Sequence, residues 1–148
     1  MEIRKYQTPD LDELGRLFND YRVFYEQPSD IALASRYIAE RTSAGDSVIF
    51  VASEDGTTLT GFCQLYPSFC SVAAAPIYVL YDLFVSPPHR RLGVGAQLLK
   101  AAAVHARAEG KVRMDLTTAK DNLKAQALYE SLGWKRDEVF YTYNLSLS

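Results

Sequence analysis

The stretch YVLYDLFVSPPHRRLGVGAQLL, residues 78–99, decides how the rest of the chain can be arranged. It predicts an apolar strand over residues 78–85, a break at two consecutive prolines, a basic turn with two glycines, and then a helix. A helix that starts in a glycine-rich turn presents unpaired backbone N–H groups and the positive end of its dipole. The stretch therefore predicts an anion-binding turn, suited to phosphate, between a strand and a helix.

Three phosphate-binding turns have this outline, and their spacing separates them. A P-loop needs a lysine followed by serine or threonine after its second glycine, where this chain has Ala96 and Gln97. A dinucleotide-binding fingerprint needs a third small residue at the position of Leu98. Neither pattern fits, so the turn belongs to a different class of phosphate site.

The pattern that remains is Arg90-x-x-Gly93-x-Gly95-Ala96, preceded by a strand ending in Leu83-Phe84-Val85. It resembles the acetyl-CoA-binding segment of the GNAT N-acetyltransferase superfamily, in which a strand, a pyrophosphate loop and a helix follow in this order. A helix that begins with glycines only for close packing is the alternative, and the prolines and paired arginines favour the cofactor. The resemblance implies cofactor contacts from Leu83, Phe84, Val85, Arg90, Arg91, Leu92, Gly93, Val94, Gly95 and Ala96.

The bulk composition is that of one globular protein. The chain has 148 residues, 48% of them hydrophobic and 23% charged, so residues 1–148 are expected to form a single domain. The resemblance implies that this is an N-acetyltransferase domain. A net charge of -2 argues against nucleic acid as a partner. The N-terminus has no apolar segment of signal or membrane length, and Cys63 and Cys70 lack metal-binding spacing. We therefore expect a cytoplasmic protein with reduced thiols, without a metal and without membrane contact.

The periodicity along the chain predicts an α/β fold of order βααβββαβαββ, a mixed β-sheet flanked by helices. This is also the order of the GNAT, or acyl-CoA N-acyltransferase, fold. The expected strands cover residues 2–6, 47–53, 59–66, 78–85 and 112–116, with one or two antiparallel strands in 134–147. The expected helices end near residues 25, 42, 109 and 132, and residues 67–76 are expected to form a loop near the site.

A second group of residues, Asn122, Ala125 and Tyr129, lies at helical spacing on one face of the last predicted helix. The resemblance implies that Asn122 contacts the pantetheine or phosphate arm, that Ala125 packs against the cofactor, and that Tyr129 gives a proton to the leaving thiolate. Transfer from a phenol of pKa ~10 to a thiolate of pKa ~8.5 is uphill by about 2 kcal/mol, which a positioned site can supply. The same spacing also suits an apolar core stripe, and only the turn at residues 90–96 favours catalysis.

Asp82 is the leading candidate for the general base. An alkylammonium of pKa ~10.4 is free base only to about one part in 2,500 at pH 7, so some group must take its proton. A carboxylate in an apolar strand is either paired or functional. Several polyamine-type GNAT enzymes have a glutamate where this chain has Tyr81, followed by an aspartate that matches Asp82. A structural bond within the sheet, or a water chain that also involves Asp115 or Glu26, remains open.

The acceptor side is expected to be walled by residues of the first two helices and the central strand. The candidates are Tyr21, Tyr25, Glu26 and Tyr81. Segments 24–30 and 140–147 add a weaker likeness to the GNAT branch that includes polyamine and histone-type acetyltransferases. That likeness implies a primary amine of a small molecule or peptide as acceptor, attacked directly, with acetyl-CoA as acetyl donor.

Two further expectations concern the strand and the assembly. Backbone N–H groups near Phe84 and Val85, where the strand is expected to bulge, would stabilise an oxyanion. The aromatic C-terminal strands would suit pairing in a homodimer. The competing functions are a CoA-binding regulatory module, which would need the turn but not Tyr129, and transfer of a longer acyl group.

Overall fold

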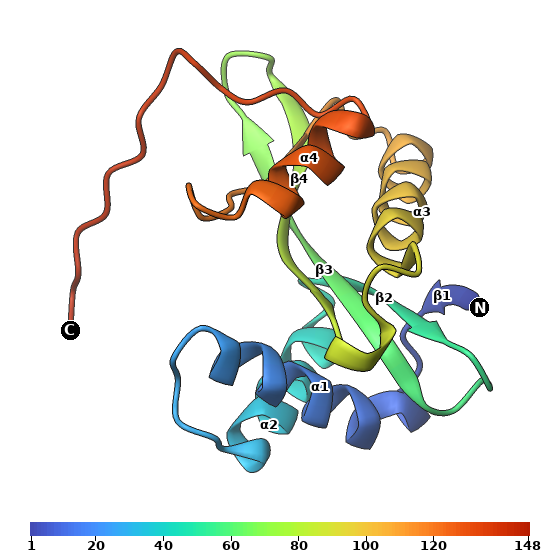
Figure 1. Ribbon diagram of the computed structural model, residues 1–148. Helices are drawn as coiled ribbons and strands as arrows, with labels where there is room; N and C mark the ends of the chain where they lie inside the picture. The colour runs from blue at the N-terminus through green and yellow to red at the C-terminus, as the bar shows by residue number, and fades with distance from the viewer. The chain divides into compact units, whose positions relative to one another are not determined.

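The computed structural model describes all residues, 1–148, and they form two compact units, residues 1–117 and 118–148. The elements in chain order (Figure 1) are β1 (Glu2–Lys5), the 3-10 helix η1 (Thr8–Asp10), α1 (Leu11–Phe24), α2 (Ile31–Ala44), β2 (Val48–Ser53), β3 (Leu59–Cys70), β4 (Ala75–Val85), the 3-10 helix η2 (Pro87–His89), α3 (Val94–Ala108), β5 (Met114–Asp115) and α4 (Leu123–Ser131). None of the helices has the length and hydrophobicity needed to span a bilayer.

The first unit is built on a five-stranded sheet of order β1-β2-β3-β4-β5. Neighbours are antiparallel from β1 to β4, whereas β5 runs parallel to β4. The parallel pair joins only Tyr78 to Met114 and Val79 to Asp115. The expected mixed sheet is thus confirmed, and β4 continues beyond Val79 with no strand beside it on the β5 side.

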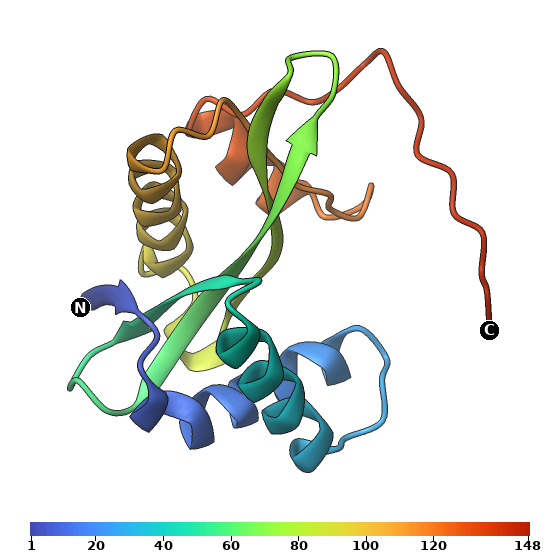
Figure 2. The same ribbon diagram turned by 180° about the vertical axis from the view of Figure 1, so that it is seen from behind.

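Helices cover both faces of this sheet, with α1 and α2 on one face and α3 on the other (Figures 1 and 2). Alternation along β3 explains how one strand serves both layers. Phe62 belongs to the core cluster on the α1 and α2 side. Its neighbour Gly61 faces α3, where an added Cβ would lie 3.1 Å from Val94 Cγ1 and 3.3 Å from Leu98 Cδ1. The missing side chain therefore lets the first turns of α3 lie directly on the sheet.

The core between the sheet and the α1–α2 pair is aliphatic and aromatic. The apolar residues of α1 recur at the helical period, which is why the sequence predicts this helix correctly. Each such large side chain stabilises the fold by about 2 kcal/mol when it leaves water. The buried members are Leu14, Leu17, Phe18, Ala34, Ile38, Ile49, Val51, Leu59, Phe62 and Phe84.

Residues 67–76, expected as a loop, belong mostly to strands. β3 runs on to Cys70 and β4 begins at Ala75, which leaves only a four-residue turn between them. The two prolines of the segment suggested a break, but Pro67 lies opposite Tyr78 in the ladder. Pairing with β2 ends at Leu65, so the rest of β3 is an edge on that side. Edge strands accept proline because its missing N–H can face away from the ladder.

The strands expected in residues 134–147 are not formed. After α4 the chain has no further helix or strand, so the order ends in βα instead of βαββ. The aromatic alternation there signals strand propensity, but a strand forms only against a partner edge. The side chains of Phe140, Tyr141 and Tyr143 are exposed.

Candidate functional site

The turn expected to bind phosphate lies between η2 and α3 and is open to solvent. Arg91 and Gly93 have positive φ angles of 66° and 81°, and Gly93 is the N-cap of α3. A Cβ added to Gly93 would meet no atom within 4 Å. Glycine is therefore required there by the backbone conformation and not by crowding. The side chains of Arg91 and Leu92 are exposed.

The amides at the start of α3 supply the donors of this turn. The first bond of the helix runs from the Gln97 N–H to the Gly93 carbonyl at 3.1 Å. The N–H groups of Val94, Gly95 and Ala96 consequently have no partner within the helix. These amides, the helix dipole and the exposed charge of Arg91 together fit the pyrophosphate of a CoA derivative.

Arg90, the other arginine of the turn, is held by the protein. Its Nε donates to the Val85 carbonyl at 2.8 Å. Its guanidinium carbon lies 5.4 Å from the centre of the Phe84 ring and 5.8 Å from that of Phe24. Arg90 thus ties the turn to the end of β4 and to the last turn of α1.

The register between β3 and β4 shifts at one place. Gln64 lies opposite Asp82, but Leu65 lies opposite Leu80, so Tyr81 is the extra residue of a β-bulge. The sequence-based expectation placed this bulge near residues 84 and 85, which is wrong, because those residues pair regularly with β3. A bulge leaves no compositional mark in an apolar strand, so its position could not be read from the residues.

Beyond the bulge, every second residue of β4 directs its backbone N–H and C=O groups to the side on which β4 has no neighbouring strand. The Ser86 N–H donates to the Thr60 carbonyl at 2.9 Å, so Ser86 faces β3. Neighbouring residues in a strand direct their backbone groups to opposite sides. The N–H groups of Leu83 and Val85 accordingly point to the open edge of β4, where Arg90 also binds the Val85 carbonyl. This edge offers donors for an extended ligand arm or for an oxyanion.

Asp82 is a buried carboxylate on the α1 and α2 face of β4, with 5% of its surface exposed. The Gln64 Nε2 donates to its Oδ2 at 2.7 Å, and Asp82 takes part in none of the ion pairs of the structure. Burial raises the pKa of the Asp82 carboxyl, while hydrogen bonds from Gln64 and Tyr21 oppose the rise. A carboxylate with a raised pKa accepts a proton more readily near neutral pH.

Six aromatic side chains that are linked to one another by ring contacts or hydrogen bonds form what we call the aromatic row: Tyr37, Tyr66, Tyr81, Tyr21, Tyr25 and Phe24. Tyr21 and Tyr66 are the members that interact with Asp82. The hydroxyl oxygens of Tyr37 and Tyr66 are 2.7 Å apart, and the rings of Tyr66 and Tyr81 are 5.5 Å apart. The Tyr21 hydroxyl donates to the Tyr81 carbonyl at 3.5 Å. Burial is the main cause that raises the pKa of Tyr21 and of Tyr66, so both phenols stay protonated at neutral pH.

The structure brings three of the four predicted acceptor residues together with Asp82, namely Tyr21, Tyr25 and Tyr81. Glu26, the fourth, is exposed just beyond Tyr25, with a positive φ of 65°.

Sequence reasoning missed Gln64, Tyr66 and Tyr37. Gln64 can be paired with Asp82 across the two strands only when the position of the bulge is known, and no signal in the sequence marks the bulge. Tyr66 carried a signal, because it is a tyrosine at the expected end of a strand beside the site.

The second unit contains the helix expected to carry the acid. Asn122 is the N-cap of α4, and its Oδ1 accepts a hydrogen bond from the Ala125 N–H at 3.2 Å. The rings of Tyr129 and Trp134 are 6.2 Å apart. The helix begins at Leu123, which puts the three predicted residues at the expected spacing along it.

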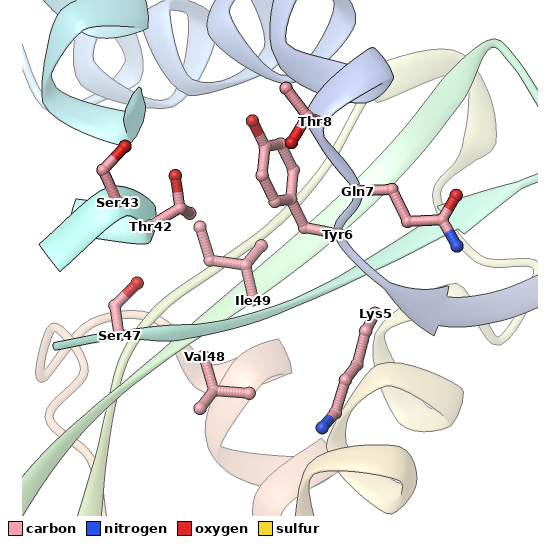
Figure 3. A pocket seen from close by; sticks show the side chains of 9 residues that line it. All are labelled: Lys5, Tyr6, Gln7, Thr8, Thr42, Ser43, Ser47, Val48 and Ile49. Carbon is pink, nitrogen blue, oxygen red and sulfur yellow. The ribbon is translucent and has the colours of Figure 1, made fainter. Parts of the chain in front are cut away.

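A surface hollow of about 430 Å³ lies elsewhere in the first unit, between β1, β2 and the end of α2 (Figure 3). Its lining carries hydroxyl groups, among them those of Tyr6, Thr42 and Ser47, but no carboxylate and no histidine. Burial raises the pKa of the Tyr6 phenol. The hollow therefore has no base for amine chemistry, and it contains none of the predicted site residues.

The turn at the N-terminus of α3 and the edge of β4 beyond its pairing with β5 together fit a ligand that carries a pyrophosphate on an extended arm, as CoA does. The model of the acetyltransferase (GNAT) family matches residues 11–134, and the chain belongs to this family. Members of the family transfer an acetyl group from acetyl-CoA, and this protein is an N-acetyltransferase.

Relatives of similar length agree with this assignment. The uncharacterized N-acetyltransferase YhfO of Bacillus subtilis is 42% identical over 99% of this chain and 98% of its own. Aminoglycoside N(6')-acetyltransferase type 1 of Salmonella typhimurium is 28% identical over 95% of this chain and 97% of its own. The crystal structure of a probable acetyltransferase, 38% identical, matches with a TM-score of 0.93 over 100% of this chain and 99% of that one.

Proposed function

We propose that this N-acetyltransferase transfers the acetyl group of acetyl-CoA directly to a primary amine of a small molecule or peptide. The observation that carries the proposal is Asp82, a buried carboxylate without an ion pair, held among tyrosines beside the open edge of β4. A buried acid of this kind is expected where an ammonium must be held and deprotonated. Acetyl-CoA supplies the activated acetyl group as a thioester.

The acetyl-CoA would be held by backbone donors more than by side chains. The N–H groups of Val94, Gly95 and Ala96 would bind the pyrophosphate, with Arg91 adding charge. The N–H groups of Leu83 and Val85 would bind along the open edge of β4 and stabilise developing negative charge there. The space at Gly93 supports this arrangement, because a Cβ added there would meet no atom within 4 Å.

Asp82 would take the proton from the acceptor ammonium. Its raised pKa favours that transfer at neutral pH. The two other carboxylates considered are less suited. Asp115 is held by Arg113, with Nε to Oδ1 at 2.7 Å and Nη2 to Oδ2 at 3.1 Å, and Glu26 is exposed to solvent.

Tyr129 would give its proton to the leaving thiolate, and Asn122 and Ala125 would contact the cofactor. The support for these roles is the spacing of the three residues along α4 and its likeness to the family pattern. We propose that both units act as one N-acetyltransferase domain, residues 1–148. Both cysteines are free, which supports a reducing compartment such as the cytoplasm.

Thiol release from acetyl-CoA, followed with and without a primary amine, tests the proposal. We expect release only with the amine, and a product whose mass shows one added acetyl group. A tertiary amine of the same size is the control, because it has no N–H to lose. If the protein binds acetyl-CoA but acetylates no amine, it is a CoA-binding module and the proposal is wrong.

A further inference from the structure

We propose that the preferred acceptor is a monoamine, with a single positive charge on an apolar and preferably aromatic body, and that polycations are poor acceptors. This inference rests on the proposed function, since it concerns the amine used in that reaction. It goes beyond it by naming the class of amine, which the aromatic row and the charges around it determine.

The aromatic row provides the surface for the apolar body. Phe24, Tyr25 and Tyr81 have 56%, 51% and 67% of their surface exposed, although each packs against another ring. So many exposed rings beside a buried carboxylate are unusual for a surface without a ligand. Ring faces attract both apolar groups and cations, so the row suits an amine with an apolar or aromatic body.

The polar part of the proposed amine site consists of the Asp82 carboxylate and the side-chain amide of Gln64, and it offers two hydrogen-bond acceptor groups to a ligand. Gln64 is fully buried and spends its Nε2 on Asp82, while its Oε1 has no hydrogen-bond partner. A buried acceptor without a partner is rare and destabilising. A primary ammonium carries three N–H donors and can serve the Asp82 carboxylate and the Gln64 Oε1 together. This polar part of the site is therefore suited to bind one cationic group.

A fixed positive charge without an ion pair stands at the Phe24 end of the aromatic row. The guanidinium of Arg90 lies 5.8 Å from the Phe24 ring and takes part in none of the ion pairs of the structure, whereas that of Arg41, 5.7 Å from the Tyr37 ring, is paired with Asp46 at 2.6 Å. A second ammonium on the acceptor, placed along the row toward Phe24, would approach Arg90 and be repelled. Glu26 lies just beyond Tyr25, but it is exposed, where solvent and salt screen its charge.

The experiment compares phenethylamine with spermidine and with neamine as acceptors at one pH and a saturating concentration of acetyl-CoA. We expect kcat/KM for phenethylamine to exceed that for either polycation by about tenfold or more. A preference for spermidine or neamine would overturn the inference and leave the proposed function standing. Absence of acetylation with all three amines and with further primary amines would overturn both.

A variant assigns the preference to the aromatic row. In Tyr25→Ala we expect the KM for phenethylamine to rise by about tenfold, with the KM for acetyl-CoA unchanged. The control is Phe69→Ala, which removes an exposed aromatic ring on the β3–β4 hairpin, outside the row, and should leave both values unchanged. An unchanged KM for phenethylamine in Tyr25→Ala would show that the row does not bind the acceptor.

Discussion

Asp82 shows how the position of one side chain sets its chemistry. If Asp82 is the base, activity is lost as the pH falls through its pKa, which burial raises above the usual aspartate range of about 4. Asp82→Asn should therefore lower kcat/KM at neutral pH by about 100-fold. Activity should return at alkaline pH, where the amine itself is deprotonated.

The pH dependence of kcat/KM, measured for both proteins with one amine, checks this prediction. A variant that keeps both the rate and the profile of the parent would show that another group accepts the proton.

The two cysteines differ in environment and should differ in reactivity. Hydrogen bonds from the Ala73 N–H and from Arg113 lower the pKa of the Cys70 thiol, whereas burial raises that of Cys63 to about 12. Since the thiolate is the reactive form, iodoacetamide should modify Cys70 in the folded protein and spare Cys63. Peptide mass mapping before and after unfolding in urea measures this. Equal labelling of both thiols in the folded protein would contradict the structure.

Single residues of the candidate site were predictable where their type alone carries meaning. A carboxylate inside an apolar strand marks Asp82, and two glycines at the start of a helix mark the turn. Gln64 and Tyr66 lie at ordinary strand positions, and their relation to Asp82 depends on the bulge at Tyr81. Such a register shift is set by pairing between strands, so no single strand's sequence reveals it.

The connection between β1 and α1 is held by a buried carboxylate, that of Asp10. The Asp10 carboxylate accepts hydrogen bonds from Nη1 and Nη2 of Arg4, at 2.7 and 2.8 Å, and from the Gln7 N–H at 2.8 Å. The bond to Arg4 is the main reason that the pKa of Asp10 is lowered. Its contribution to stability is therefore present above the unfolded-state pKa of about 3.9 and is lost as the pH falls through the folded-state value.

Asp10→Asn should cost about 3 kcal/mol of unfolding free energy at pH 7, because it removes the buried carboxylate that pairs with Arg4 and leaves only the exposed Glu2 beside that guanidinium. The variant should also lose less stability than the parent on acidification. Urea unfolding at pH 7 and pH 3 measures both effects. Equal unfolding free energies of the two proteins at pH 7 would show that the ion pair between Arg4 and Asp10 does not stabilise the fold.

The elements of the first unit follow from sequence patterns in most places. Helix periodicity located α1, α2 and α3, and the crossover through α3 implied that β4 and β5 are parallel. The long β3–β4 hairpin was missed because Pro67 and Pro76 looked like breaks, although both lie within the ladder. Proline position relative to a sheet edge is a tertiary property, and composition does not contain it.

At the scale of the whole molecule, the sequence predicted the family, the mixed sheet and the order of its elements up to α4. It did not predict that residues 134–148 would lack strands. The aromatic alternation there is real, but a strand requires an edge to pair with, and the residues alone do not name that edge.

The C-terminal segment leads to a prediction about assembly. Its exposed aromatic side chains would be buried if two copies paired through residues 140–147. We expect sedimentation to give the mass of a dimer for the parent protein, and that of a monomer for a variant with Tyr141→Lys and Tyr143→Lys, since charge opposes burial. A monomeric parent protein would contradict this prediction.

Calorimetric titration of acetyl-CoA into the parent protein and into two glycine variants at opposite ends of α3 tests the cofactor turn most directly. Gly95→Val places a side chain where the pyrophosphate should approach the amides, and we expect its affinity to fall by about tenfold or more. Gly110→Asn, beyond the far end of the helix at a φ of 74° that asparagine tolerates, should bind like the parent. Equal affinity in all three proteins, or no binding by the parent, would contradict the account.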